Sequence, residues 1–178
     1  MIAAADIVSF WREAGEKAWF AKDDTFDLRC RDFEAAHHAA ARGEYAAWED
    51  SAEGALALCL LLDQIPRNIY RNSPHAFATD GLAQGVALRA LAARHDAATP
   101  MPLRIFFYLP LEHAENMALQ AQCLELMRAT GVENFVRYAE LHRDIIARFG
   151  RFPHRNAALG RVSTSAELDF LASGGFAG

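Results

Sequence analysis

Lysine is nearly missing from this sequence: Lys17 and Lys22 are the only lysines among its 18 basic residues. An arginine bias of this kind is typical of a GC-rich genome, so a single arginine is weak evidence of function. Basic residues are also outnumbered by acids, and the 178 residues carry a formal net charge of -5. This balance argues against a general nucleic-acid binder and against a protein that binds membrane surfaces. We therefore expect neither nucleic acid nor a membrane among the partners.

Cysteine is scarce as well. Cys30, Cys59 and Cys123 are odd in number, far apart and free of any C-x-x-C spacing, which predicts reduced, buried thiols in a cytosolic protein. The N-terminal stretch "MIAAADIVSFWREAG" lacks the basic region of a secretory signal peptide. The longest apolar run, residues 55–62, is too short to cross a bilayer. These absences together predict a cytoplasmic protein.

Common catalytic motifs are absent too. The sequence has no phosphate-binding P-loop, no dinucleotide-binding glycine motif, no G-x-S-x-G and no H-E-x-x-H. One Glu-x-x-His pair, Glu34 and His37, occurs without the second copy that a di-metal helical bundle needs, so we interpret it as a surface feature. We expect no cofactor and no bound metal. A mixed nitrogen and oxygen metal site stays open as an alternative, with candidate ligands Asp63, Glu112, His113, His142 and His154.

Helical periodicity dominates the sequence, and no convincing alternating strand is present. Its length and its 52% hydrophobic content predict a single domain, residues 1–178. Short connections favour an all-α fold of stacked antiparallel hairpins, similar to a tetratricopeptide superhelix, with a compact bundle as the alternative. No strict 34-residue repeat is present. We expect seven or eight helices, at about 4–21, 24–42, 45–65, 74–95, 114–130, 133–149 and 165–172, with a short one in "LRIFFYL".

Three boundaries within this pattern rest on single residues. Gly43 is expected to stop the second helix, and Pro66 to end the third near Gln64, because the residue before a proline avoids the α region. Thr164 followed by Glu167 predicts a capping box at the start of the last helix. The glycines Gly81 and Gly85 suggest a close helix crossing.

Polar residues on apolar stripes are the most informative positions. His142 shares a helix face with apolar residues, and Asp63 lies on the stripe formed by Leu56, Cys59 and Leu60. A buried carboxylate needs a partner, which Arg67, four residues on, can supply. Both residues can also be hydrogen-bonded core groups that only fix helix packing.

Glu112 and His113 form a second anomaly, directly after a proline-broken apolar segment. A break of this kind can aim side chains into a cleft. It can equally be a helix N-terminus at which the acids Glu112 and Glu115 are favoured.

The segment "HRDIIARFGRFPHRNAALGR", residues 142–161, concentrates positive charge in an acidic chain. Residues 137–161 hold six arginines against two acids, a local balance of +4, so the remainder sums to -9. Gly150 is a suitable helix C-terminal residue, and Phe152 before Pro153 is expected to be extended. Arginine's planar fork suits carboxylates and phosphates, while asparagine and neutral histidine add directional hydrogen bonds. The side chains thereby released to converge are Arg151, His154, Arg155 and Asn156.

Structural roles remain an alternative for this arginine cluster. Arg148 can pair with Asp144 at i, i+4, and Arg143 and Arg155 can cap helix C-termini.

Three stretches resemble bacterial domain-of-unknown-function family 924: "LLDQIPRNIYRNSPHAFATD", "FFYLPLEHAE" and "HRDIIARFGRFPHRNAALGRVSTSAELDFL". The resemblance spans nearly the whole chain and implies an all-helical fold of the tetratricopeptide-like type, without implying a reaction. The recurring family positions begin with Asp63, Gln64, Pro66, Arg67 and Asn68, followed by Leu109, Pro110, Glu112, His113 and Glu115. The third stretch adds His142, Arg143, Arg148 to Asn156, Gly160, Arg161, Ser163 and Thr164. Ala158 and Val162 stand at looser positions of the pattern.

The leading hypothesis is a binding module whose cleft receives an anionic small molecule or a peptide carboxylate. The expected ligand-binding residues are Arg67, Asn68, His113, Arg143, Arg151, His154, Arg155 and Asn156. Asp63, Glu112 and His142 are expected behind them as supporting partners. One alternative is an enzyme in which His113 or His154 acts as acid or base beside Glu112, with arginines stabilising negative charge. Another is a scaffold for protein partners, and a homodimer is a further possibility.

Overall fold

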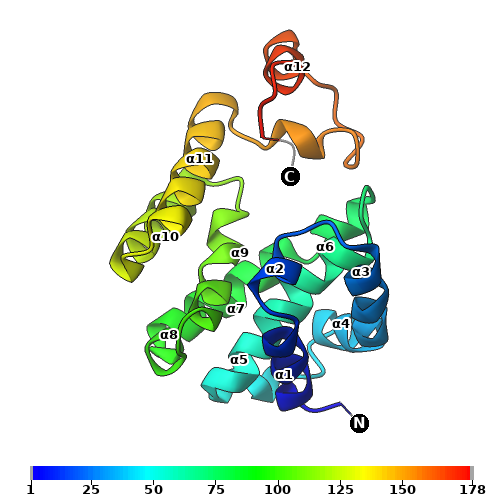
Figure 1. The fold of residues 1–178 in the computed structure, drawn as a ribbon, viewed down its shortest axis with the longest axis vertical. Helices are drawn as coiled ribbons and strands as arrows, with labels where there is room; N and C mark the ends of the chain where they lie inside the picture. The colour runs from blue at the N-terminus through cyan, green and yellow to red at the C-terminus, as the bar shows by residue number, and fades with distance from the viewer. Residues whose placement is uncertain (1, 177–178) are drawn as a thin grey trace. The chain divides into compact units, whose positions relative to one another are not determined.

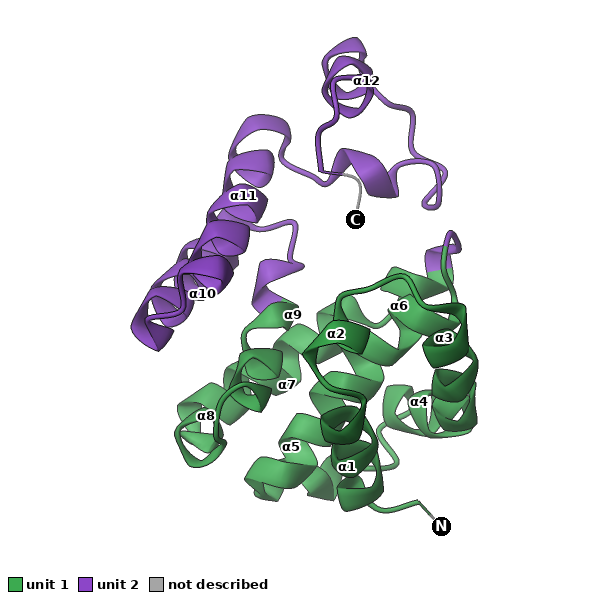
Figure 2. Cartoon of the chain, viewed as in Figure 1, with its two compact units in different colours: residues 1–71, 75–110 green, residues 72–74, 111–178 purple. Residues whose placement is uncertain are grey.

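The protein is all-helical in residues 2–176, the part of the chain that the computed structural model describes (Figure 1). The chain forms two compact units (Figure 2). Unit 1 comprises residues 1–71 and 75–110, and unit 2 comprises residues 72–74 and 111–178. The expectation of one domain over residues 1–178 stays a prediction.

The helices that begin in unit 1 are α1 (Ala4–Ala14), α2 (Glu16–Trp19), α3 (Asp24–Cys30), α4 (Glu34–Ala41), α5 (Ala52–Cys59), α6 (Ile65–Ile69), α7 (Asp80–Ala92), α8 (His95–Ala98) and α9 (Leu109–Glu112). Unit 2 holds α10 (Met117–Thr130), α11 (Glu133–Phe149) and α12 (Ser165–Ala172). Short 3₁₀ helices lie at Arg31–Phe33, Ala46–Asp50, Pro74–Phe77, Leu103–Phe107 and Pro153–Arg155.

The expectation of seven or eight helices is wrong, because residues 2–176 form twelve α-helical segments. Local backbone geometry divides the long segments that periodicity predicts. Gly15, with φ of 75°, separates α1 from α2, and a 3₁₀ turn separates α3 from α4. Thr79 precedes the seventh helix, which begins at Asp80 rather than at Pro74. An apolar stripe continues across such kinks, so hydrophobic spacing does not reveal them.

Pro66 does not end a helix at Gln64. The chain passes from α5 through a π-helical turn, Leu60–Gln64, directly into α6, where Pro66 occupies the first turn. Pro66 has no N–H to donate, and the carbonyl oxygens of Leu61 and Leu62 in the preceding turn accept hydrogen bonds from the side chains of His37 and Thr79 instead. The wider turn therefore carries Asp63 and Gln64 into the interior, with 1% and 6% of their surfaces exposed.

The core of unit 1 combines an aromatic cluster with the apolar helix α5. Trp11, Trp19, Phe26 and Phe106 pack with ring centroids 5.0–6.4 Å apart. At Gly54 in α5 the helix backbone lies close to the backbone of Trp48, and an added Cβ would be 2.2 Å from the Trp48 oxygen. At Gly81 and Gly85, by contrast, a Cβ would meet nothing closer than the Arg89 guanidinium, so they do not form the predicted helix crossing.

The Glu34–His37 pair is not a surface feature. His37 is 4% exposed, and its Nδ1 donates a hydrogen bond to the carbonyl oxygen of Leu61 at 2.8 Å. Glu34 accepts a hydrogen bond from the hydroxyl of Tyr70 at 2.7 Å. Both side chains therefore fasten α4 to other elements of unit 1.

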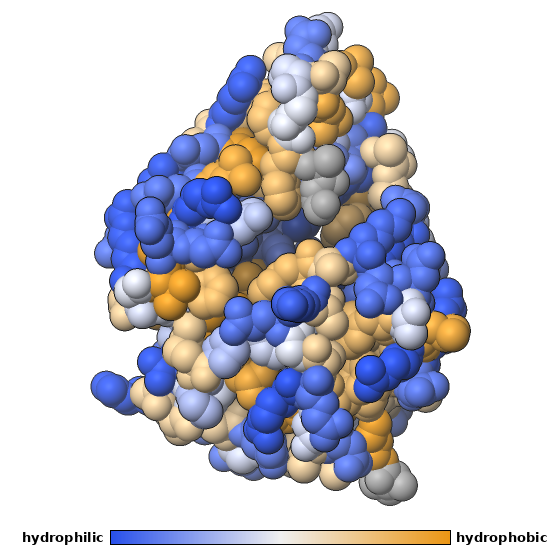
Figure 3. Space-filling model, in the orientation of Figure 1, coloured by the Kyte–Doolittle hydropathy of each residue, from blue (hydrophilic) through white to orange (hydrophobic). Residues whose placement is uncertain are grey.

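Unit 2 is built on the hairpin of α10 and α11, which turns at Gly131 in the left-handed conformation. α11 buries one stripe, Ala139, His142, Ile145 and Ile146, as its periodicity predicts. The surface over α10 and α11 in Figure 3 is largely hydrophilic, as expected for the opposite face of amphipathic helices.

The C-terminal segment follows its sequence signals closely. Gly150 ends α11 with φ of 71°, Phe152 is extended, and Thr164 opens α12 with the predicted capping box to Glu167. Ile145, Ile146 and Phe152 form the buried core of this segment, with Phe149, Phe170 and Phe176 packed against them. Within residues 2–176, we find no helix with both the length and the apolar character needed to cross a membrane.

Candidate functional site

Two of the three sequence motifs meet in unit 2 at the backbone of Phe152. Glu115 accepts a hydrogen bond from the Phe152 N–H at 2.8 Å and a bidentate ion pair from Arg161 at 2.7 and 2.9 Å. Arg161 also donates to the Phe152 carbonyl at 3.1 Å. Burial alone would raise the pKa of Glu115, but the hydrogen bonds from Arg161 and Phe152 outweigh it and hold that pKa below its usual value. Glu115 therefore holds the C-terminal motif in place through the Phe152 backbone and the Arg161 side chain.

The ring of Phe152 is fully buried and carries polar groups on several sides. The ring centroids of His142 and His154 lie 5.5 and 5.6 Å from it, and the Arg155 guanidinium carbon lies 4.4 Å from it. Phe176 packs against both histidines, at 4.7 and 5.3 Å. We call Phe152, His142, His154, Arg155 and Phe176 the Phe152 cluster.

His142 has a fixed Nδ1 proton in this cluster. Its Nδ1 lies 2.8 Å from the carbonyl oxygen of Tyr138 and 3.4 Å from Oε1 of Glu112. Since a carbonyl only accepts, Nδ1 carries a proton. The ring of His113 lies 6.3 Å away. Glu112 and His142 are 4% and 5% exposed, so this pair is an interior carboxylate–imidazole contact.

Asn156 and Arg143 have local structural roles. Asn156 is 1% exposed, donates to Ser163 at 3.0 Å and accepts from Arg161 at 2.9 Å, which closes the loop before α12. Arg143 pairs with its neighbour Asp144 at the surface of α11. Sequence spacing does not predict these pairs, because several other arginines and polar side chains lie nearby in the sequence as alternative partners.

Arg151 forms a bidentate ion pair with Glu167. Its Nε and Nη2 donate to the two carboxylate oxygens of Glu167 at 2.6 and 2.8 Å, and Nη2 also donates to the Val162 carbonyl. Glu167 accepts in addition from the Thr164 N–H at 2.7 Å. The Arg151 guanidinium, followed by the Thr164 N–H, lowers the pKa of Glu167 to about 2. Arg151 thus joins the end of α11 to the start of α12.

This ion pair predicts a specific loss of stability in acid. The folded-state pKa of Glu167 is about 2, below its ordinary value of 4.5. The stabilisation is therefore present above pH 4.5 and is lost as the pH falls toward 2. We expect Glu167→Gln to be less stable than the parent at pH 7, with a gap that narrows below pH 4.5. Chemical denaturation at each pH measures this, with Asp169→Asn on the same helix as control; a gap independent of pH would contradict it.

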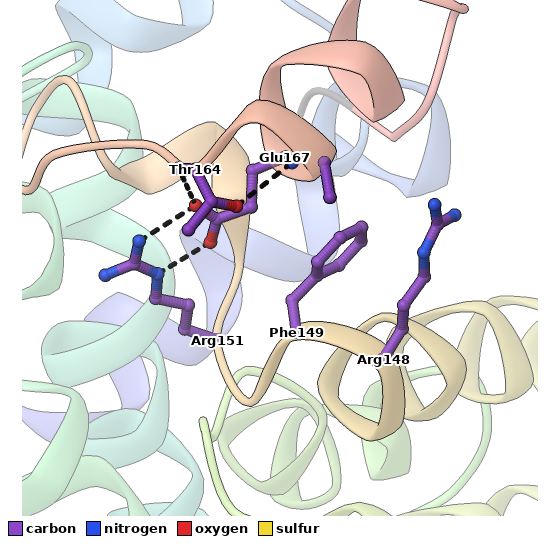
Figure 4. A pocket seen from close by; sticks show the side chains of 6 residues that line it. Arg148, Phe149, Arg151, Thr164 and Glu167 are labelled. Carbon is purple, nitrogen blue, oxygen red and sulfur yellow. Dashed lines mark hydrogen bonds and ion pairs between the residues drawn. The ribbon is translucent and has the colours of Figure 1, made fainter.

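A hollow of about 490 Å³ lies beside this pair, and we call it the Arg148 hollow (Figure 4). Its lining residues are Arg148, Phe149, Arg151, Thr164, Ala166 and Glu167. Figure 4 shows Arg148 and Arg151 on opposite sides of Phe149. The Arg148 guanidinium carbon lies 4.6 Å from the ring centroid of Phe149 and 5.7 Å from that of Phe170. Within residues 2–176, no acid forms an ion pair with Arg148.

Sequence reasoning missed this role for Arg148. The expected i, i+4 pair with Asp144 is wrong, because Asp144 binds Arg143 instead. The signal that could have shown it was the aromatic residue directly after Arg148, together with a nearer arginine competing for the same acid. Phe170 contributes from 22 positions further along, which spacing within α11 could not reveal.

The first motif forms its own polar group inside unit 1. Arg67 pairs with Asp63 and with Asp80, each at 3.0 Å, which confirms the predicted Asp63–Arg67 pair. Asn68 donates to the Gln64 carbonyl at 3.1 Å and accepts from Arg71 at 3.2 Å.

In the part of the chain that the structure describes, no three histidine, cysteine, aspartate or glutamate side chains are arranged to hold a metal ion. Asp63, Glu112, His113, His142 and His154, the candidate ligands of the mixed nitrogen and oxygen metal site, therefore do not form a three-ligand group in these residues.

Comparison with known proteins agrees with the motif pattern. The chain is similar to the solved structure of a protein of unknown function from Agrobacterium tumefaciens, with 48% sequence identity and a TM-score of 0.92. The match covers 96% of this chain and 97% of the other. No curated protein is significantly similar in sequence. A family model described as "Bacterial protein of unknown function (DUF924)" matches residues 7–175, so the chain belongs to this family.

Proposed function

We propose that the protein binds a small anion in the Arg148 hollow. The observation that carries this proposal is the exposed guanidinium of Arg148, which lies on Phe149 and Phe170 and has no ion-pair partner within residues 2–176. Stacking on aromatic rings holds the planar fork in place and leaves its in-plane N–H groups to donate. A carboxylate or phosphate accepts such groups in pairs.

The other surface arginines of the motif support this choice by contrast. Arg151 is paired with Glu167, Arg161 with Glu115 and Arg143 with Asp144. An anion at any of these would have to compete with a carboxylate already in place. Arg148 is therefore the primary contact for the anion, and Arg151 adds a flanking positive charge.

Most of the other residues expected to bind the ligand position the chain around the hollow and do not contact the anion. His154, Arg155 and Asn156 shape the segment that leads from α11 to α12, and His113 lies beside His142. Arg67 and Asn68 are given no part in the Arg148 hollow.

A thermal-shift experiment tests anion binding. At constant ionic strength, phosphate, sulfate and small carboxylates are compared with chloride, and at least one is expected to raise the melting temperature, because a ligand that binds only the folded state stabilises it. Arg148→Gln should remove the increase. Arg137→Gln should retain it, because Arg137 is on the same helix and stacks similarly on Tyr138 at 5.2 Å, but does not line the hollow. Equal increases in both variants would contradict the proposal.

Acid–base catalysis is a second candidate, favoured by the fixed Nδ1 proton of His142 beside Glu112. A carboxylate near one imidazole nitrogen orients the ring and supports the other nitrogen as a base. A ligand found in the thermal-shift experiment would then be converted by the parent protein and recovered unchanged from His142→Asn. Recovery of unchanged ligand from both proteins would exclude this candidate for that ligand.

Three wider assignments complete the proposal. We propose tetratricopeptide-like stacking of helical hairpins, for which the α10–α11 hairpin gives support, and a cytoplasmic location, consistent with three buried free thiols. A homodimer or protein-binding face is a further proposal, supported by partly exposed apolar residues Met117, Val132, Tyr138 and Leu141. Analytical ultracentrifugation of the parent chain tests the dimer.

A further inference from the structure

We infer that the ligand of the Arg148 hollow is a monocarboxylate that carries an aromatic or other flat apolar group, in preference to a phosphate ester. This inference rests on the proposed anion-binding function and specifies the class of anion.

The charges that line the hollow favour a single negative charge. Arg148 and Arg151 contribute two positive charges, and Glu167 contributes one negative charge, which leaves one positive charge to neutralise. Glu167 remains ionised at neutral pH, because its pKa is lowered to about 2 by Arg151 and by the Thr164 N–H. A monocarboxylate balances the lining, whereas a phosphate dianion would add an uncompensated charge beside a fixed carboxylate.

The hydrogen-bond donors that remain also match one carboxylate. Arg148 offers its planar fork, whose face is already occupied by Phe149. The side chain of Thr164 is hydrogen-bonded to Glu167, so Arg148 is the donor left for a ligand. Its fork can satisfy two oxygens, while the additional oxygens of a phosphate would lie near the Glu167 carboxylate.

The apolar residues of the lining favour a ligand that carries a flat apolar group beside its carboxylate. Phe149 and Ala166 are the apolar residues of the lining, and the Phe149 ring packs from behind against Phe170, with centroids 5.2 Å apart at 55°. Figure 4 shows the Phe149 ring pointing toward α12 between the two arginines. A flat apolar substituent beside the bound carboxylate would cover this partly exposed ring and displace water from it, which an inorganic anion cannot do.

Isothermal titration of the parent chain with four matched probes tests the inference at pH 7.5. Benzoate carries both features, acetate lacks the ring, benzamide lacks the charge, and phenyl phosphate carries the ring on a dianion. We expect benzoate to bind at least about tenfold more tightly than acetate, because only benzoate buries a ring, and more tightly than phenyl phosphate. Benzamide should give no measurable binding.

Two variants separate the possible failures. Arg148→Gln should lose benzoate binding. Phe149→Leu should weaken benzoate binding more than acetate binding, because both anions lose the ring that positions the Arg148 fork and only benzoate also loses a ring contact. Equal affinities for benzoate and acetate, or tighter binding of phenyl phosphate, with Arg148 still required, would overturn the inference and leave anion binding intact. Absence of binding by all charged probes, or binding that persists in Arg148→Gln, would overturn both.

Discussion

Replacing Phe152 by alanine is expected to lower the free energy of unfolding by about 3–5 kcal/mol, the range for truncating a buried aromatic side chain. The ring is fully buried, and it forms the core of the C-terminal segment with Ile145 and Ile146. Its removal would also leave His142, His154 and Arg155 without the surface on which they pack. Chemical denaturation followed by circular dichroism measures the change.

The matched control is Phe20→Ala, which removes the same atoms from a site that is 57% exposed. It should cost less than about 1 kcal/mol, as surface substitutions usually do. A Phe152→Ala protein as stable as the control would show that the ring does not organise the C-terminal motif.

Removal of the Asp63 carboxylate is expected to cost about 3 kcal/mol, toward the lower end of the range for breaking a buried ion pair. Asp63 is 1% exposed, accepts a hydrogen bond from Gln64 at 2.5 Å and pairs with Arg67 at 3.0 Å. In Asp63→Ala the guanidinium of Arg67 would lose one of its two acids and keep Asp80. This remaining pair, and the 19% exposure of the Arg67 side chain, limit the loss.

Asp144→Ala is the control for this second substitution. Asp144 also binds an arginine, Arg143, but its side chain is 66% exposed. Exposed pairs typically contribute about 0–1 kcal/mol. If denaturation curves showed the same small loss for both variants, Asp63 would not be an essential counter-charge in the interior of unit 1.

Much of the local structure could be predicted from the sequence because its signals are local. The apolar stripe of α11, the left-handed Gly150, the extended Phe152 and the capping box of Thr164 each depend on residues a few positions apart. The Asp63–Arg67 pair is of the same kind, with its partners one helical turn apart. Helix number could not be predicted, because the apolar stripe continues across the breaks at Gly15 and at the 3₁₀ turn Arg31–Phe33.

The site was harder to predict, because it depends on which acid neutralises which arginine. Glu115 and Arg161 are 46 positions apart, and Arg151 and Glu167 are 16 apart, so spacing does not select these pairs among several arginines. The arginine content of the sequence directs attention to residues 142–161. Only the fold shows that Arg143, Arg151 and Arg161 are paired while Arg148 rests on two aromatic rings.

Side-chain NMR of the arginine Nε–H groups during an anion titration tests the central role of Arg148 most directly. The Arg148 signal is assigned as the one missing from Arg148→Gln, and the Arg137 signal as the one missing from Arg137→Gln. With benzoate added at constant ionic strength, the Arg148 signal should move to a saturating end point while the Arg137 signal stays in place. A saturating titration in which the Arg148 signal does not move would contradict the account.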